Sequence, residues 1–256
     1  VGIYALVLVY DWTVLAIVLG TNAYLLISCI ITAFLGAIEA KKKGIKFKVS
    51  LNKVNLLKEN LELGKYFIVG NGLAYIFIRW DLLVVSIVVH DSLLIGYYSF
   101  AKSLLNRVRI IFTKINSLLY PIFSEQDAIS NFKVMKKLLN AGNIIALTIS
   151  VILAFFIMGF AEEGIILVSL FIEKMLAYQN AATILSIFGL LLIPYSLDVA
   201  IIPYFNGIGE VDKLVKANAI LLGSSLILLP LLSTYFGIIG ATLAYISSQY
   251  LRMLYW

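Results

Sequence analysis

The segment LNAGNIIALTISVILAFFIMGF, residues 139–160, contains no charged residue and is long enough to cross a lipid bilayer as one helix. A transmembrane helix needs about 20 predominantly apolar residues. Similar stretches recur along the chain, of which 62% is hydrophobic and only 13% charged. Soluble domains are about half apolar and a quarter charged. The composition therefore predicts an integral membrane protein made of helices and excludes an ordinary water-soluble enzyme domain.

The apolar stretches predict an all-α fold, a polytopic bundle of about eight transmembrane helices. The chain begins at Val1 inside an apolar run, without an initiator Met or a signal-peptide pattern, so we interpret it as lacking its natural N-terminus. The expected spans are 1–19, 22–40, 66–89, 94–123, 139–160, 181–204, 214–235 and 236–256.

One long polar connection, 41–65, divides the chain into two expected parts, 1–40 and 66–256. Cytoplasmic loops are enriched in Lys and Arg, so this segment is expected on the cytoplasmic side. Its basic residues outnumber Glu59 and Glu62; they are Lys41, Lys42, Lys43, Lys46, Lys48, Lys53, Lys58 and Lys65.

The side of every other connection follows by alternation from the cytoplasmic position of 41–65. Segment 131–137, the Lys213/Lys216 turn and Arg252 are then cytoplasmic. The pair His90–Asp91 and the pair Glu162/Glu163 lie outside. The basic residues thus fall on one side, which makes the topology internally consistent and indicates a multi-pass protein of the cytoplasmic membrane.

The expected span 94–123 carries four basic residues well away from its ends: Lys102, Arg107, Arg109 and Lys114. Each costs about 2.5–3.5 kcal/mol near a bilayer centre, so they must face protein or water. Steps of three and four place Arg109 on a continuous polar stripe of one helix face, with Arg107 and Lys114 on a second row. The stripe consists of Lys102, Asn106, Arg109, Thr113, Asn116 and Tyr120.

Acidic residues within the spans are too few to neutralise this stripe, Asp11, Asp81 and Asp198 being the main candidates. Asp81 needs a partner on another helix. One interpretation makes these groups interhelical ion pairs that hold the bundle together; the other makes the stripe a site for an anionic ligand. We expect substrate contacts from Lys102, Arg107, Arg109, Lys114, Arg79 and Asn106. Because Cys29 and His90 are the only residues of their kinds, neither a metal site nor a cofactor is expected.

Proline and glycine mark further features of the later spans. Pro194 and Pro203 flank Asp198, and Pro230 falls in the next span, so helix breaks or kinks are expected there. Gly237 and Gly240 provide small faces for close helix packing.

The order and spacing of several short motifs resemble the polysaccharide flippases of the multidrug, oligosaccharidyl-lipid and polysaccharide exporter superfamily. The resemblance covers most of the chain and implies a two-lobed transporter whose first spans are missing here, with 1–40 as the last helices of the first lobe and 66–256 as a second, six-helix lobe. The motifs are Ile78-Arg-Trp-Asp81, Ile95-Gly-Tyr-Tyr-Ser-Phe-Ala-Lys102, Tyr120-Pro-Ile-Phe-Ser-Glu125, Leu170-Phe-Ile-Glu-Lys174, Ala181-Ala-Thr-Ile-Leu-Ser-Ile and Tyr235-Phe-Gly-Ile-Ile-Gly-Ala-Thr-Leu-Ala-Tyr245.

The resemblance implies alternating access around a cationic cavity that accepts the diphosphate and sugar head of a polyprenyl-linked oligosaccharide. Lys102, Arg107 and Arg109 match the basic character of the cavity-lining helix. Expected partners are this lipid-linked substrate, membrane lipid and other proteins of polysaccharide assembly, but no nucleic acid. No Walker motif is present, so a nucleotide-driven pump is not indicated.

Three other functions remain open. An ion-coupled multidrug antiporter of the same superfamily would favour carboxylates in its cavity, against which the basic stripe argues. A membrane enzyme of polysaccharide assembly usually needs acids or histidines on a sizeable outer loop. Here the largest outer segment is only about 161–180, so the protein is not expected to be an enzyme. The third alternative is a purely structural membrane scaffold.

Overall fold

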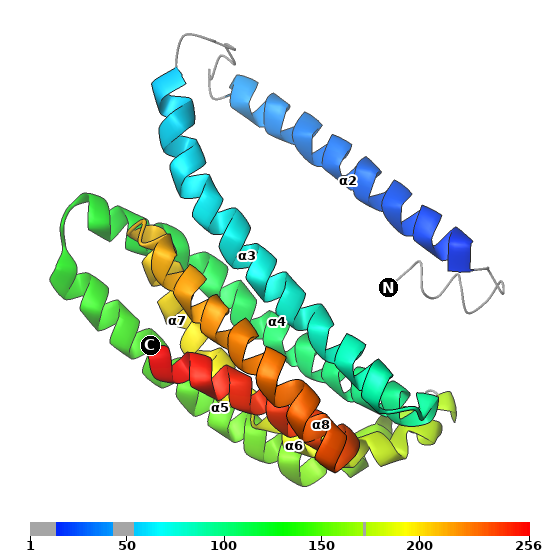
Figure 1. The fold of residues 1–256 in the computed structure, drawn as a ribbon. Helices are drawn as coiled ribbons and strands as arrows, with labels where there is room; N and C mark the ends of the chain where they lie inside the picture. The colour runs from blue at the N-terminus through cyan, green and yellow to red at the C-terminus, as the bar shows by residue number, and fades with distance from the viewer. Residues whose placement is uncertain (1–13, 43–53, 171–172) are drawn as a thin grey trace. The chain divides into compact units, whose positions relative to one another are not determined.

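The computed structural model describes residues 14–42, 54–170 and 173–256, and in these every regular element is a helix (Figure 1). The chain divides into two compact units, Val1–Asn55 and Leu56–Trp256, each described by itself below. The helices are α2 (Val14–Lys42), α3 (Val54–Val88), α4 (Ser92–Ala128), α5 (Phe132–Ser169), the 3-10 helix η1 (Glu173–Ala181), α6 (Ala182–Gly189), α7 (Leu192–Gly207) and α8 (Val211–Tyr255).

The first unit contributes one described helix, α2. Its side chains Leu26, Ile30 and Phe34 are exposed, as expected of a helix that meets lipid rather than water. Lys41 and Lys42 occupy its last turn, where positive charge interacts favourably with the helix dipole. Of the expected first span, residues 1–13 lie outside the described residues, and 14–19 are the beginning of α2. Of the predicted basic linker, 43–53 lie outside the described residues and 54–65 are the first turns of α3.

The second unit is a helix bundle whose centre is made of aromatic side chains from different helices. The rings of Phe77 in α3 and Tyr245 in α8 lie 4.6 Å apart between centroids. Phe188 of α6 contacts both Tyr98 of α4, at 5.3 Å, and Tyr245, at 6.0 Å. These side chains are at most 1% exposed. The contacts therefore tie α3, α4, α6 and α8 into one core.

The expected span 181–204 is two helices, α6 and α7, that form a bent pair with an angle of 49°. Pro194 lies in the first turn of α7, where a missing N–H breaks no helical hydrogen bond. The predicted break is therefore present and falls at Leu190–Leu191, whereas Pro203 lies inside α7 and Pro230 inside α8. The predicted break at Pro230 is not seen.

The helix α8 reverses direction at Gly237, which has φ 59° and ψ −135°. Only glycine adopts such a conformation readily. After the reversal the two halves of α8 lie against each other: a Cβ placed on Gly240 would be 1.9 Å from the backbone oxygen of Leu232. Figure 1 shows this hairpin, from orange to red. The two spans predicted to meet at residues 235–236 are thus the two arms of one reversed helix, and the close packing expected at Gly240 is present.

Three described helices, within Gly64–Val88, Phe132–Leu167 and Val211–Tyr255, are long and apolar enough to cross a membrane, or four if the α6/α7 pair is one span. The prediction of about eight spans is therefore not confirmed. The helix α4 is too rich in charge to qualify, α8 counts once although it contains two expected spans, and residues 1–13 are not described. The all-helical fold and its compatibility with membrane insertion are confirmed.

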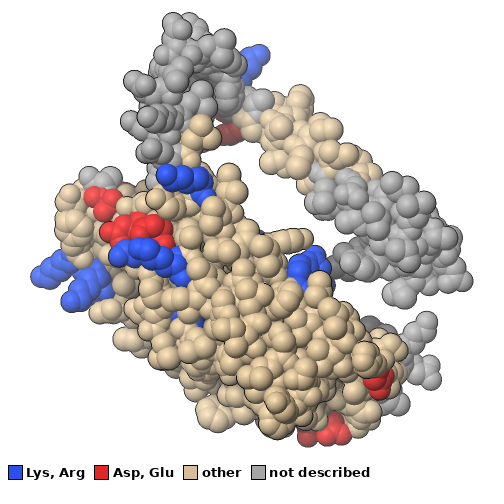
Figure 2. Space-filling view, in the orientation of Figure 1, with Lys and Arg blue, Asp and Glu red and all other residues tan. Residues whose placement is uncertain are grey.

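The outside of the second unit is suited to lipid. Ile145, Ile152 and Phe155 of α5 are each at least 60% exposed, which water would strongly disfavour. Figure 2 shows charged atoms gathered toward the ends of the unit, with a largely uncharged surface between them. In Figure 1 the α4–α5 and α7–α8 connections lie at one end of the bundle, whereas the α3–α4 connection and the turn of the α8 hairpin lie at the other.

Candidate ligand-binding cavity

A buried ion pair joins α3 to α4. The Lys102 Nζ lies 2.5 Å from the Oδ2 of Asp81, which also accepts a hydrogen bond of 2.8 Å from the Tyr98 hydroxyl. Lys102 donates a second hydrogen bond, of 3.1 Å, to the backbone oxygen of Ile78. Its ammonium group also lies 4.8 Å from the centroid of the Tyr245 ring. Asp81 and Lys102 are 0% and 6% exposed.

These contacts give Asp81 the partner on another helix that the sequence requires. They also show what Lys102, which we expected among the substrate contacts, contacts in this structure. Its charge is neutralised by Asp81 and its donors point to protein acceptors, so in this structure Lys102 holds α3 and α4 together.

A second buried ion pair joins α7 to the end of α8. The Nη2 of Arg252 contacts the Oδ2 of Asp198, and both residues are less than 10% exposed. The backbone oxygen of Asp198 accepts a hydrogen bond of 3.2 Å from the Asn116 amide on α4. The sequence placed Arg252 on the cytoplasmic side, at the end of the last expected span. The hairpin at Gly237 returns the end of α8 to α7 and buries Arg252 there.

Arg109 of α4 lies between these two pairs and belongs to neither. Its guanidinium is 4.4 Å from the centroid of the Tyr195 ring on α7, an arrangement in which the ring face attracts the cation. It makes no ion pair within the described part of the chain. The side chain is half-buried. Arg109 is therefore a cation that is held in place by an aromatic ring and not neutralised by a carboxylate.

Arg109 and Arg252 line the same cavity, about 290 Å³ in volume, between α3, α4, α7 and α8. Three asparagines accompany them: Asn71, Asn206 and Asn218, the last of which donates a hydrogen bond of 3.0 Å to the Gly70 oxygen. The remaining lining residues are Tyr66, Phe67, Gly70, Ala74, Ile202, Val211, Leu214 and Trp256. The walls thus combine two cations, neutral amides and aromatic rings.

Arg109 also lines a smaller neighbouring cavity of about 40 Å³, together with Thr113, Asn116, Tyr195 and Asp198. Three members of the predicted stripe, Arg109, Thr113 and Asn116, therefore face α7 across these spaces. The periodicity of the stripe correctly grouped them on one side of α4.

The other predicted site residues lie elsewhere. Arg107 and Lys114 are exposed, as is Arg79, whose guanidinium lies 5.6 Å from the centroid of its neighbour, the Tyr75 ring. Asn106 is half-buried. The structure therefore brings Arg109 into the cavity and leaves Arg107, Lys114, Arg79 and Asn106 outside its lining.

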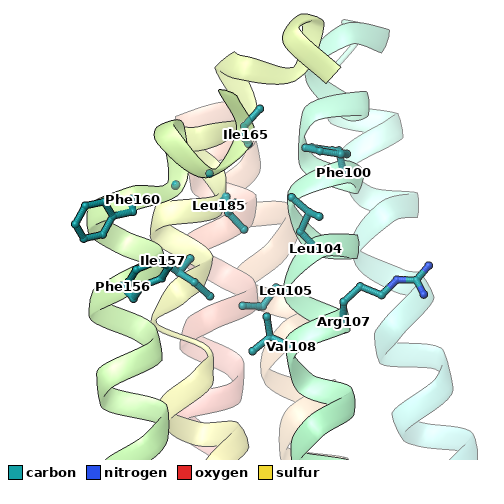
Figure 3. A pocket seen from close by; sticks show the side chains of 12 residues that line it. Phe100, Leu104, Leu105, Arg107, Val108, Phe156, Ile157, Phe160, Ile165 and Leu185 are labelled. Atoms are coloured by element: carbon teal, nitrogen blue, oxygen red, sulfur yellow. The ribbon is translucent and has the colours of Figure 1, made fainter. Parts of the chain in front are cut away.

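Arg107 borders a different hollow, an apolar groove of about 340 Å³ between α4, α5 and α6. Figure 3 shows Phe100, Phe156 and Phe160 around this groove, with the guanidinium of Arg107 extending away from the phenylalanines. Only the stem of Arg107 therefore faces the apolar surface, which is common for long basic side chains.

The sequence prediction missed Arg252, Asn206, Asn218 and Trp256 as lining residues. One signal was available: Asp198 sits in an apolar span and requires a basic partner, and Arg252 is the only basic residue in the last expected span. The three others line the cavity because of the bend before α7 and the hairpin in α8. The spacing of residues along the sequence does not predict where these two features place the side chains.

No protein-family model, no curated protein and no solved structure matches the chain. The class of the protein is therefore defined by its fold and its cavity. In its described residues the protein is all-helical, with helices suited to a membrane, and a cationic, amide-rich cavity lies between α3, α4, α7 and α8.

Proposed function

We propose that this chain is the second lobe, with the end of the first, of a membrane flippase that moves a polyprenyl-diphosphate-linked oligosaccharide across the cytoplasmic membrane. The substrate has a charged, hydroxyl-rich head and a lipid tail. Because the tail can remain in the bilayer, the protein needs to shelter only the head. Such a task requires a polar cavity among membrane helices, and no chemical conversion.

The observation that carries the proposal is the position of Arg109. It is a cation in a cavity between helices, unpaired within the described residues and held against the Tyr195 ring. An uncompensated charge among membrane helices is costly, and such residues generally mark a substrate or ion pathway. A cation in a low-dielectric cavity attracts an anionic head group strongly.

The position of the cavity along the bundle supports uptake from the cytoplasmic side. Its lining includes Tyr66 at the start of one expected span, Asn206 at the end of another, and Val211 at the start of α8. The positive-inside rule assigns Lys65, Lys213 and Lys216, which neighbour these positions, to the cytoplasm. A cavity at this end would receive the head group where lipid-linked sugars are assembled.

We include in the proposal the expected number of about eight transmembrane spans, which is larger than the three or four helices that qualify by length and composition. The two arms of α8 meet at Gly237, and each is near or above the roughly 17 residues that a short span needs. The helix α4 would cross the membrane with Lys102 and Arg109 turned toward α3 and α7, while Arg107 and Lys114 remain exposed. An antiporter for cationic drugs is less compatible with this cavity, because its charge is positive and both nearby carboxylates, Asp81 and Asp198, are already paired.

The test is transport by the full-length protein in proteoliposomes, with a fluorescent polyprenyl-diphosphate oligosaccharide as the substrate. Arg109→Gln should reduce flipping at least tenfold, since the cation is lost while the volume of the side chain is largely kept. Lys137→Gln, which removes an exposed cation on α5, serves as the matched control and should flip like the unaltered protein.

Equal flipping by the Arg109→Gln and Lys137→Gln proteins, at the same reconstituted amount, would remove the observation on which the proposal rests. Transport of a cationic dye in place of the lipid-linked glycan would favour the antiporter.

A further inference from the structure

We propose that the cavity around Arg109 and Arg252 holds one acidic sugar of the transported glycan, such as a uronic acid residue. This inference rests on the proposed function and names the part of the substrate that this cavity recognises. It is carried by the charge of the cavity, by the kinds of hydrogen-bonding groups left without partners in it, and by its aromatic walls.

The charge balance indicates a ligand group with one negative charge. Arg252 is neutralised by Asp198, and Lys102 by Asp81. Of the two cations that line the cavity, Arg109 is the one without a carboxylate partner within the described residues. A single carboxylate would balance it, whereas a diphosphate would leave excess negative charge in a poorly hydrated space. A planar carboxylate also matches the fork of N–H donors on a guanidinium.

The unpartnered polar atoms of the cavity include both donors and an acceptor. The Arg252 Nε and the Trp256 Nε1 are buried N–H donors without a partner, and the Asn206 Oδ1 is a buried acceptor without one. Arg252 is itself 5% exposed and lines the cavity. Buried polar groups are almost always hydrogen-bonded. These three atoms have almost no exposed surface, so a ligand in the cavity pairs with them only after a small turn of the lining side chains.

A mixed set of donors and acceptors distinguishes sugars from phosphates. Phosphodiester oxygens only accept hydrogen bonds, so a phosphate could satisfy Arg252 and Trp256 but not the Asn206 oxygen. A sugar hydroxyl donates and accepts at once. The amides of Asn71 and Asn218 add further groups of both kinds around the same space. The set as a whole therefore fits a ligand rich in hydroxyl groups.

The aromatic walls and the size fit one sugar ring. Trp256 stacks on Phe205, with 5.5 Å between ring centroids, and Tyr66 and Phe67 line the same cavity. Flat apolar surfaces of this kind cover the C–H face of a ring while polar groups at the edge orient it. At about 290 Å³ the cavity lies at the lower end of the range for small-molecule sites. It is suited to one residue of the glycan and not to the whole repeat.

The test measures binding by ligand-observed NMR to the full-length protein in lipid nanodiscs. Three probes are used: methyl glucuronide, methyl glucoside and inorganic phosphate. The two glycosides share a ring and differ in the carboxylate. The glucuronide should bind about tenfold more tightly than either other probe. Arg109→Gln should bring its affinity down to that of the glucoside, and Asn206→Leu should weaken both glycosides several-fold without affecting phosphate. Lys137→Gln is the control and should leave all three affinities unchanged.

Equal affinity for the two glycosides would overturn the assignment of an acidic sugar. Phosphate binding as tight as that of the glucuronide, and insensitive to Asn206→Leu, would assign the cavity to the phosphate head group instead. Absence of glucuronide binding would also overturn the inference. None of the probes carries a lipid or a diphosphate, so these results are independent of the flipping assay: a protein that flips its substrate but binds no glucuronide loses only the sugar assignment.

Discussion

Arg252 and Asp198 are 54 positions apart in the sequence and form a buried ion pair between the end of α8 and the middle of α7. In a straight helix α8, Arg252 would lie about 50 Å from Asn218, at 1.5 Å per residue. Both line one cavity because Gly237 folds the helix back on itself. The pair therefore holds the end of α8 in place as one wall of the cavity, and it also fixes the contact between α7 and α8.

Removing the carboxylate of this pair should destabilise the protein strongly. Asp198→Asn leaves the buried Arg252 cation without a counter-charge, which costs about 3–5 kcal/mol. The double variant Asp198→Asn/Arg252→Gln removes both charges and should recover much of the loss. Thermal unfolding in detergent micelles measures both effects. A double variant as unstable as the single one would mean that the pair contributes through packing and not through charge.

The Asp81–Lys102 pair should contribute to the stability of the protein and not to ligand binding. Lys102→Met keeps the apolar stem but leaves Asp81 unpaired, so we expect a loss of stability of about 3–5 kcal/mol. Asp81→Asn/Lys102→Met should restore most of it. In protein that remains folded, glucuronide affinity should change less than twofold. A tenfold weakening by the double variant, with stability restored, would instead return Lys102 to the ligand site.

The hairpin of α8 should fail when Gly240 receives a side chain. A Cβ at this position would overlap the Leu232 backbone oxygen, which cannot move without separating the two arms. Gly240→Ala should cost at least about 3 kcal/mol in unfolding free energy, the upper part of the range for overpacking. Gly223→Ala is the matched control, because no atom lies within 4 Å of its added Cβ and alanine favours helix by about 1 kcal/mol. Equal stability of the two variants would contradict the close approach of the arms.

The ring of Tyr195 should position Arg109. Tyr195→Phe retains the aromatic face and should leave flipping within about twofold of the unaltered protein. Tyr195→Leu removes the face, and a desolvated cation–π contact of about 2 kcal/mol corresponds to a loss of up to about 30-fold. The flipping assay in proteoliposomes distinguishes the two. Similar losses from both substitutions would point to the Tyr195 hydroxyl and not to the ring.

The sole cysteine allows a direct test of topology. Cys29→Ser provides a background without cysteine, into which His90→Cys or Lys137→Cys is introduced singly. On intact cells a membrane-impermeant maleimide should label the His90→Cys protein, and the Lys137→Cys protein only after permeabilisation. His90 belongs to the α3–α4 connection and Lys137 lies near the start of α5, and these two segments are at opposite ends of the bundle in Figure 1. Labelling of both in intact cells would contradict the assigned orientation.

Those features that depend on composition and helical period could be predicted from the sequence. The apolar excess predicted the helical membrane fold, and the spacing of three and four residues grouped Arg109, Thr113 and Asn116 on one side of α4. The position of Asp81 inside an apolar span showed that it needs a partner on another helix. Each of these conclusions requires only local geometry or a count of charges.

Features set by the meeting of distant segments could not be predicted in this way. Which cation neutralises Asp81 depends on how α3 and α4 pack, so the sequence did not distinguish the paired Lys102 from the unpaired Arg109. The glycines in Phe236-Gly-Ile-Ile-Gly240 indicated close packing. The expected boundary between two spans at 235–236 placed the reversal within two residues of Gly237, but nothing in the sequence indicated that the Leu232 carbonyl lies against Gly240.

The unpaired charge of Arg109 has an electrical consequence for the proposed cycle of alternating access. A membrane potential does work of about 2.3 kcal/mol per elementary charge per 100 mV. With an acidic sugar bound, the Arg109 charge is balanced, so the charge that moves with the loaded cavity is that of the diphosphate, which a potential that is negative inside drives outward. Once the sugar has left, the positive charge returns, and a potential that is negative inside draws the empty cavity back toward the cytoplasm. The resting voltage of the cell would then reset the flippase after each passage, without a coupled ion.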